Sequence, residues 1–264
     1  KVFIGSLEGV MYALDATTGK LLWTFETEGQ ILGSANRIPG AGKQLVFGSY
    51  DNYLHCIDMD SGEEIWKYQT THFINGSPAI DVDGILFGGC DAILHTISPQ
   101  SGEQTISIDL DIYLAGSPAI GNNKVYVGTY GGQLFCLEMN SDNILWQFQS
   151  AENAAPILSS PALGSTRIYF GSRDQNLYCL NKNTGRKIWT FKTRGEVDSS
   201  PVLNGNRVIF GSKDGSLYLV NSISGEKVWS YDLGSPIVSS PAVAQDYVLI
   251  GSQAGALYAF KGKQ

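Results

Sequence analysis

The chain has 264 residues, of which 43% are hydrophobic and only 16% are charged. Its 18 lysines and arginines and 25 aspartates and glutamates give a formal net charge of -7, and the basic residues form no run. Phosphate groups are bound by positive stripes, so this balance argues against nucleic acid or an anionic membrane surface as the main partner. No apolar run reaches the ~18 residues of a transmembrane helix, so we expect no transmembrane segment.

One repeated unit accounts for nearly the whole chain. Each unit contains a β-rich run that ends in glycine, and these glycines are Gly5, Gly48, Gly88, Gly128, Gly171, Gly211 and Gly251. They are separated by 43 or 40 residues, an interval typical of propeller blades. The sequence therefore contains seven units of one supersecondary element.

Each unit predicts four short strands, which we name A to D in chain order. In one unit these strands are residues 201–203, 207–211, 216–221 and 227–231. They alternate apolar and polar residues, are rich in β-branched and aromatic side chains, and are separated by turn residues such as Asp214-Gly215. Seven such units predict an all-β fold, a seven-bladed β-propeller of four-stranded antiparallel blades that forms a single domain over residues 1–264.

Both ends of the chain fall inside a unit. Residues 1–5 predict a strand B, and residues 257–260 predict a strand C. One strand D and one strand A are therefore missing from an otherwise regular series. We expect about 20 residues upstream of Lys1 to supply them, as part of a longer polypeptide.

The tryptophans all occupy one position of the unit, in strand D. They are Trp23, Trp66, Trp146, Trp189 and Trp229. A glycine lies four residues before each, except that Asp142 precedes Trp146, and Ile106 takes the position in the third unit. We interpret these rings as structural anchors between blades, with each indole N–H bonded to the backbone.

The stretch Tyr-Ala-Leu-Asp-Ala-Thr-Thr-Gly-Lys-Leu-Leu-Trp at residues 12–23 resembles the repeat of the PQQ-like, or quinoprotein-type, β-propellers. The resemblance spans essentially the whole chain and is clear again at 181–189 and 221–229. The family includes PQQ-dependent dehydrogenases, the lipoprotein of the outer-membrane barrel-assembly machinery, sensor regions of bacterial kinases and domains appended to adenylate-forming ligases. The resemblance therefore implies the fold without selecting one activity.

The resemblance does not extend to a catalytic or metal site. The dehydrogenase members carry an adjacent pair of cysteines beside the quinone and an acidic and amide set that holds calcium. This chain has no adjacent cysteine pair and no such set that matches residue by residue. We therefore assign no catalytic or metal residue, favour a non-enzymatic role, and consider PQQ and calcium only by analogy of fold.

Cysteine and histidine are explained by the repeat. Cys56, Cys136 and Cys179 share one strand C position and are expected to be unpaired small hydrophobes, while Cys90 lies in a B–C turn. Unpaired thiols favour a reducing compartment such as the cytoplasm, whereas many members of the family are periplasmic, so the compartment stays open. His55 and His95 replace an aromatic residue of strand C and supply too few ligands for a metal.

The variable positions lie in the D–A loops and B–C turns, which share one face of a propeller. Aligning the units places aromatic residues on this face in the second to fourth units and charged residues in the fifth and sixth. The candidate binding residues are Tyr50, Phe73, Tyr113, Tyr130, Arg173, Glu196, Asp198 and Lys213. A three-residue insertion at about residues 151–155 falls in a D–A loop of the same face.

Tyrosine and arginine are enriched at protein-binding hot spots. The leading interpretation is therefore a non-catalytic propeller that binds a protein or peptide through its D–A/B–C loop face, as a scaffold or sensor domain. One alternative is a small quinoprotein oxidoreductase that uses PQQ and calcium. Another is a small-ligand receptor that uses the central channel, where Asn75 and Asp198 could converge.

Overall fold

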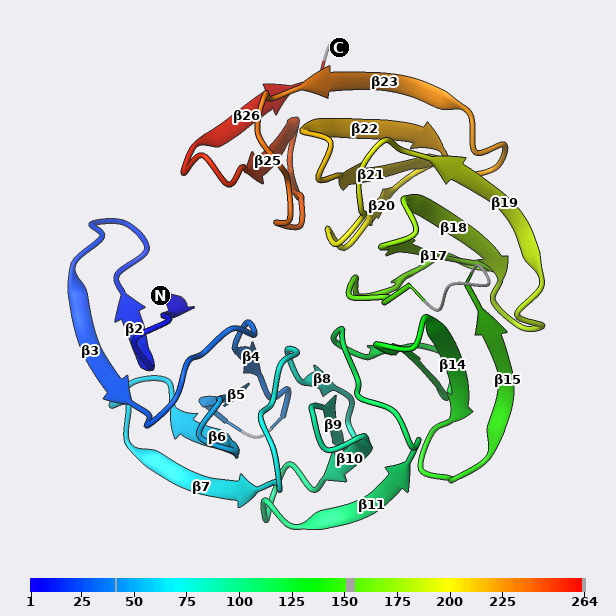
Figure 1. Cartoon of the computed structure of the whole chain (residues 1–264). Helices are drawn as coiled ribbons and strands as arrows, with labels where there is room; N and C mark the ends of the chain where they lie inside the picture. The colour runs from blue at the N-terminus through cyan, green and yellow to red at the C-terminus, as the bar shows by residue number, and fades with distance from the viewer. Residues whose placement is uncertain (41, 151–154, 263–264) are drawn as a thin grey trace. The chain divides into compact units, whose positions relative to one another are not determined.

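The computed structural model describes residues 1–40, 42–150 and 155–262. Within these residues the chain forms strands β1 to β26 and no helix, and the fold is a seven-bladed β-propeller, as the repeats predict (Figure 1). None of the described elements is a helix long and apolar enough to cross a membrane. Most of the predicted insertion, residues 151–154, lies outside the described residues.

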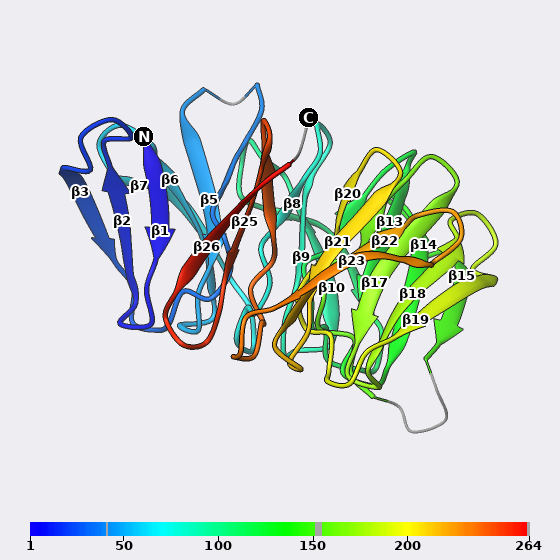
Figure 2. The same ribbon diagram turned by 90° about the horizontal axis from the view of Figure 1, so that it is seen from above.

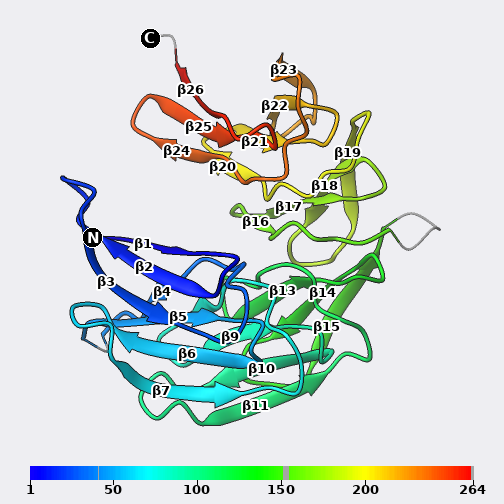
Figure 3. The same cartoon turned by 60° about the vertical axis from the view of Figure 1, so that its left-hand side comes forward.

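The first three blades follow the predicted order of strands, and blade 1 has no strand A among the residues that the structure describes. Blade 1 contains β1 (Val2–Gly5), β2 (Val10–Leu14) and β3 (Leu21–Glu26). Blade 2 contains β4 (Asn36–Arg37), β5 (Gln44–Gly48), β6 (Tyr53–Asp58) and β7 (Glu64–Gln69), of which β5, β6 and β7 are seen side by side in Figure 3. Blade 3 contains β8 (Ala79–Ile80), β9 (Ile85–Gly88), β10 (Ile93–Ile97) and β11 (Gln104–Asp109).

The remaining blades repeat this order, and the seventh has no strand D among the described residues. Blade 4 contains β12 (Ala119–Ile120), β13 (Lys124–Gly128), β14 (Gln133–Glu138) and β15 (Ile144–Gln149). Blade 5 contains β16 (Ala162–Leu163), β17 (Arg167–Ser172), β18 (Asn176–Asn181) and β19 (Lys187–Lys192), the last three of which neighbour one another in Figure 2. Blade 6 contains β20 (Val202–Asn204), β21 (Arg207–Gly211), β22 (Ser216–Asn221) and β23 (Lys227–Asp232). Blade 7 contains β24 (Ala242–Ala244), β25 (Tyr247–Gly251) and β26 (Leu257–Lys261).

The chain divides into two compact units. Unit 1 comprises Lys1–Val125 and Glu138–Asn143, and unit 2 comprises Tyr126–Leu137 and Ile144–Gln264. Each unit has cores of buried strand B and strand C side chains, around Phe47 and Phe87 in unit 1 and around Phe170 and Phe210 in unit 2. Alternate residues of these strands reach the two faces of a blade, so both faces are apolar where blades stack.

The glycine that ends strand B is required by a close contact between blades. A Cβ atom at Gly48 would lie 2.2 Å from Cγ2 of Ile74, and one at Gly171 would lie 2.4 Å from Cγ1 of Val197. Ile74 and Val197 are fully buried residues of the D–A loops that enter the next blade. The repeated glycine thus makes room for a residue that fastens each D–A loop to the preceding blade.

The repeated tryptophans pack against the glycine of the next C–D turn. The contacts join Trp23 to Gly62, Trp66 to Gly102, Trp146 to Gly185 and Trp189 to Gly225. The indole N–H donates to a backbone carbonyl from Trp23 at 3.3 Å, from Trp146 at 3.1 Å and from Trp189 at 3.3 Å. The Trp66 N–H differs, because it is buried and has no partner among the described residues.

Candidate functional site

The B–C turns and D–A loops are joined by a repeated backbone hydrogen bond. In five blades an N–H of the turn donates to a loop carbonyl, from Tyr50 to Gln30 at 2.9 Å, Cys90 to Phe73 at 3.0 Å, Arg173 to Pro156 at 3.0 Å, Lys213 to Glu196 at 2.8 Å and Gln253 to Pro236 at 3.0 Å. Within each of these blades, the two variable positions therefore lie beside each other. This backbone contact recurs in the five blades, whereas the side chains beside it differ.

In unit 2, four candidate residues form one ion-pair network, which we call the charged quartet: Arg173, Glu196, Asp198 and Lys213. Arg173 donates from Nε and Nη2 to the two oxygens of Asp198 at 3.0 and 3.1 Å. Lys213 Nζ lies 2.6 Å from Glu196 Oε2 and 2.9 Å from Asp198 Oδ2. A forked arginine–carboxylate pair is the strongest type of charge-assisted bond. The quartet therefore satisfies its own charges.

Asp198 is the centre of this network. Its side chain is only 11% exposed, whereas those of Arg173 and Lys213 are 34% and 29% exposed. Burial alone raises the pKa of the Asp198 carboxyl, but the hydrogen bonds and charges of Arg173 and Lys213 outweigh burial and hold this pKa below its ordinary value. Asp198 is therefore ionised at neutral pH, with both oxygens already occupied.

In unit 1, the equivalent positions hold very different side chains, which we call the aromatic quartet: Tyr50, Phe73, Asn75 and Cys90. The Tyr50 and Phe73 rings stack with centroids 4.7 Å apart and planes 4° apart, and Phe73 is 43% exposed. Asn75 donates from Nδ2 to the Cys90 sulfur at 3.1 Å. The Asn75 Oδ1 atom is buried and has no hydrogen-bond partner among the described residues.

Of the eight candidate binding residues, two belong to the aromatic quartet and four to the charged quartet. Tyr113 and Tyr130 are 54% and 41% exposed and belong to neither. The candidate set did not contain Asn75 and Cys90, which the structure adds to the stacked rings. A signal for them existed, because they occupy the repeat positions of Asp198 and Lys213 in another blade.

His55 and His95 take the place of a repeated tyrosine. Their rings stack on Phe47 and Phe87, with centroids 5.5 and 5.0 Å apart. Each Nε2 lies within hydrogen-bonding distance of an aspartate four residues earlier, at 2.9 Å for His55 and 2.8 Å for His95. In blade 6, Tyr218 donates to Asp214 in the same way at 2.7 Å. These histidines therefore hold B–C turns, as the repeat predicts for an aromatic position.

None of the four cysteines, all of which lie in the described residues, forms a disulfide. Burial raises the pKa of Cys56 and of Cys179 to about 12. A thiol with so high a pKa is almost entirely protonated at neutral pH and is a poor nucleophile. The strand C cysteines are thus packing residues, and Cys90 is the one that lies at the loop face.

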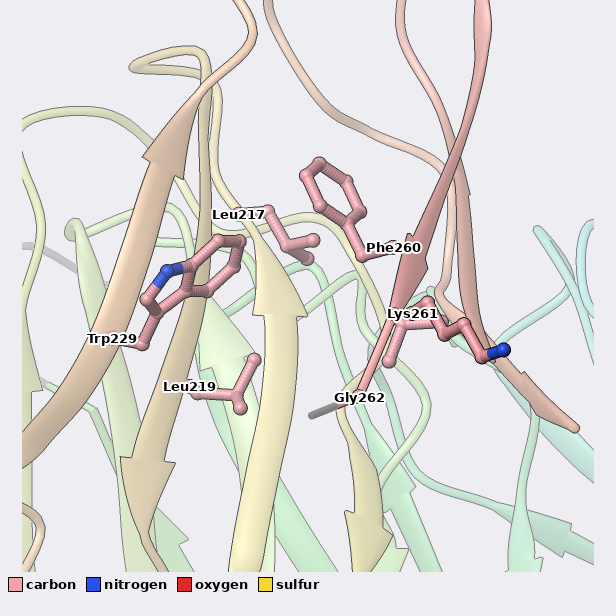
Figure 4. Close-up of a pocket in the computed structure, with 7 residues that line it drawn as sticks. Leu217, Leu219, Trp229, Phe260, Lys261 and Gly262 are labelled. Carbon is pink, nitrogen blue, oxygen red and sulfur yellow. The ribbon is translucent and has the colours of Figure 1, made fainter. Parts of the chain in front are cut away.

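An apolar cleft of about 470 Å³ lies between blades 6 and 7, lined by Leu217, Leu219, Trp229, Val248, Phe260, Lys261 and Gly262. Figure 4 shows the Trp229 and Phe260 rings on either side of Leu217, and the Lys261 side chain points away from the indole. The two ring centroids are 5.4 Å apart. Trp229 is 38% exposed, because no following C–D glycine covers it within the described residues. The cleft thus belongs to the packing between blades.

The residues of the loop face do not fit a PQQ and calcium site. Calcium takes carboxylate and carbonyl oxygens in sets of six to eight, and both oxygens of Asp198 are bonded to Arg173 and Lys213. Over the described residues, no group of three histidine, cysteine, aspartate or glutamate side chains could hold a metal ion. No reaction step through these groups is supported.

The family is decided by a match to nearly the whole chain. The model of the β-alanine-activating enzyme β-propeller matches residues 1–263. The chain belongs to this β-propeller family. The PQQ-like repeat of the sequence is confirmed as the basis of the fold, while none of the curated proteins compared with the chain matches it.

Solved structures share the fold of this chain at low identity. The crystal structure of BamB from Moraxella catarrhalis is 23% identical, with a TM-score of 0.82, and the match covers 99% of this chain and 79% of that chain. The computationally designed Ika8 protein is 14% identical, with a TM-score of 0.70, over 98% of this chain and 92% of that chain. These likenesses concern the fold alone.

Proposed function

We propose that this chain is a non-catalytic propeller that binds a protein or peptide across its D–A/B–C loop face, as a scaffold or sensor domain. One observation carries the proposal. Strands B and C of blades 2 to 6 are mostly buried, whereas the loop face exposes aromatic side chains that differ from blade to blade, including Phe73, Tyr113 and Tyr130. Exposed aromatic residues and arginine are the side chains that hot spots use.

The family description supports placing this propeller within a β-alanine-activating enzyme. In such a polypeptide the activation chemistry would belong to another region, and the propeller would hold the partner. The resemblance of the repeat to domains appended to adenylate-forming ligases points the same way.

A site-specific crosslink tests this proposal in the full polypeptide. We place p-benzoylphenylalanine at Tyr113 and, as a matched control, at Tyr247, which is 41% exposed and lies in β25. We expect a discrete adduct from position 113 and none from position 247. Affinity for the recovered partner should fall about 10-fold when Tyr50, Tyr113 and Tyr130 are changed to alanine. A partner that binds unchanged after these three substitutions would contradict the assignment of the face.

A further inference from the structure

The aromatic quartet lacks the cations that its counterpart supplies for itself. In unit 2, the guanidinium of Arg173 and the ammonium of Lys213 both lie within 3.1 Å of Asp198 oxygens. Tyr50 and Cys90 occupy their places in unit 1 and carry no charge. The amide oxygen of Asn75, at the position of Asp198, is left without a donor. A buried acceptor without a partner is unfavourable, and a ligand that donates hydrogen bonds would relieve it.

The stacked rings add a second preference for a cation. Tyr50 covers one face of Phe73, and Phe73 remains 43% exposed. The face of an aromatic ring attracts an ammonium or guanidinium group, and the planar guanidinium also stacks on it. An ammonium or guanidinium group has several N–H donors and no acceptor. It therefore suits both the Phe73 ring and the Asn75 Oδ1 atom.

The charge of the surrounding unit favours the same kind of ligand. Unit 1 contains 6 lysines and arginines against 17 aspartates and glutamates, a net charge of -11, whereas unit 2 contains 12 against 8, a net charge of +4. The acidity of the whole chain therefore resides in the unit that carries the aromatic quartet. A negative field concentrates cationic groups near it and speeds their association.

We propose that the aromatic quartet binds an arginine or lysine side chain of an extended peptide partner. The cation lies on the exposed face of Phe73 and donates to Asn75 Oδ1, in the role that Arg173 and Lys213 play toward Asp198. The amide exposes this oxygen by turning about its own χ2 bond. That turn exchanges the positions of Oδ1 and Nδ2 and breaks the bond from Nδ2 to the Cys90 sulfur, a weak acceptor. This inference rests on the proposed peptide-binding function and names the chemistry of the partner.

The test is the binding of a fluorescent, end-blocked peptide with two arginines, measured by anisotropy at low ionic strength. Its matched control is the same peptide with citrulline, which keeps the shape and loses the charge. We expect the arginine peptide to bind about 10-fold more tightly. Phe73→Ala and Asn75→Ala should each remove this preference. Asp83→Asn removes a negative charge from an exposed turn outside the quartet and should change binding less than about 2-fold.

The outcomes separate this inference from the function on which it rests. Equal binding of the two peptides, weakened by Phe73→Ala, would keep peptide binding at this face and overturn the cation. A preference for arginine that survives both alanine variants would place the cation elsewhere and overturn the site. No binding of the arginine peptide would overturn the inference, while the crosslink at position 113 decides the function independently. Thermal melts of both variants confirm that they are folded.

Discussion

The aromatic and charged quartets occupy the same repeat positions, three blades apart, on nearly the same backbone. The turn N–H of Cys90 bonds to the Phe73 carbonyl at 3.0 Å, and that of Lys213 bonds to the Glu196 carbonyl at 2.8 Å. Only the side chains differ. The charged quartet closes its own network, whereas the aromatic quartet exposes a ring and leaves an amide oxygen without a donor. One scaffold thus provides an internally satisfied surface and a surface open to a ligand.

The largest expected effect tests what the two quartets share. Gly48→Ala and Gly171→Ala each place a Cβ within 2.4 Å of the buried residue that fastens the D–A loop. Overpacking of this kind should lower the free energy of unfolding by about 3 kcal/mol in both variants, measured by urea denaturation. If one variant is tolerated and the other is not, the two loops do not depend on the same contact.

The next prediction concerns a difference in stability between variants of the two quartets. Asp198→Ala leaves Arg173 and Lys213 without their shared carboxylate and should cost about 2 kcal/mol of stability. Asn75→Ala removes an oxygen that has no partner together with one bond to the Cys90 sulfur, a weak acceptor, and should change stability by less than about 0.5 kcal/mol. Equal losses in the two variants, measured by denaturant melts at neutral pH, would show that the quartets are not energetically different.

The dependence on pH sharpens the same difference. The folded-state pKa of Asp198 lies below its ordinary value because Arg173 and Lys213 outweigh the effect of burial. Stability from this carboxylate is therefore present above its unfolded pKa of about 3.9 and lost as the pH falls through the folded-state value. The wild type should exceed Asp198→Asn in stability at pH 7, and the gap should shrink below about pH 4. A gap that does not depend on pH would contradict the ion-pair account.

The last prediction is that PQQ with calcium has no effect on the melting temperature. Both oxygens of Asp198 are bonded to Arg173 or Lys213. In the aromatic quartet, Asn75 is the only side chain with an amide or carboxylate oxygen that calcium could use. A ligand that binds the folded form raises the melting temperature by mass action. We expect PQQ with calcium to leave the melting temperature unchanged. A saturable increase would instead support a quinoprotein oxidoreductase.

Much of the fold could be predicted from the sequence because each blade is built from contacts that are local in the chain. The strands predicted at 207–211 and 216–221 coincide with β21 and β22. Strand B glycines were also recognisable as a repeat. The reason for a glycine at this position could not be predicted. The contact of Gly48 with Ile74 joins one blade to the loop that leads into the next, and it depends on how the two blades pack.

The candidate site was predicted less completely for a related reason. Alignment of the units placed Tyr50, Phe73 and the charged residues on one face. Residue type alone did not reveal that Arg173 and Lys213 form ion pairs with Asp198. Nor did it reveal the unsatisfied oxygen of Asn75. Both depend on side-chain distances, which the repeat spacing does not specify.

Giving the aromatic quartet the arginine–aspartate pair of the charged quartet tests the central claim most directly. The double variant Tyr50→Arg with Asn75→Asp gives unit 1 an internal arginine–aspartate pair without changing its net charge. The account predicts that this variant binds the arginine peptide about 10-fold more weakly than the wild type, with stability changed by less than about 1 kcal/mol. Undiminished binding by the folded double variant would contradict the claim that the aromatic quartet binds a cation because it lacks one of its own.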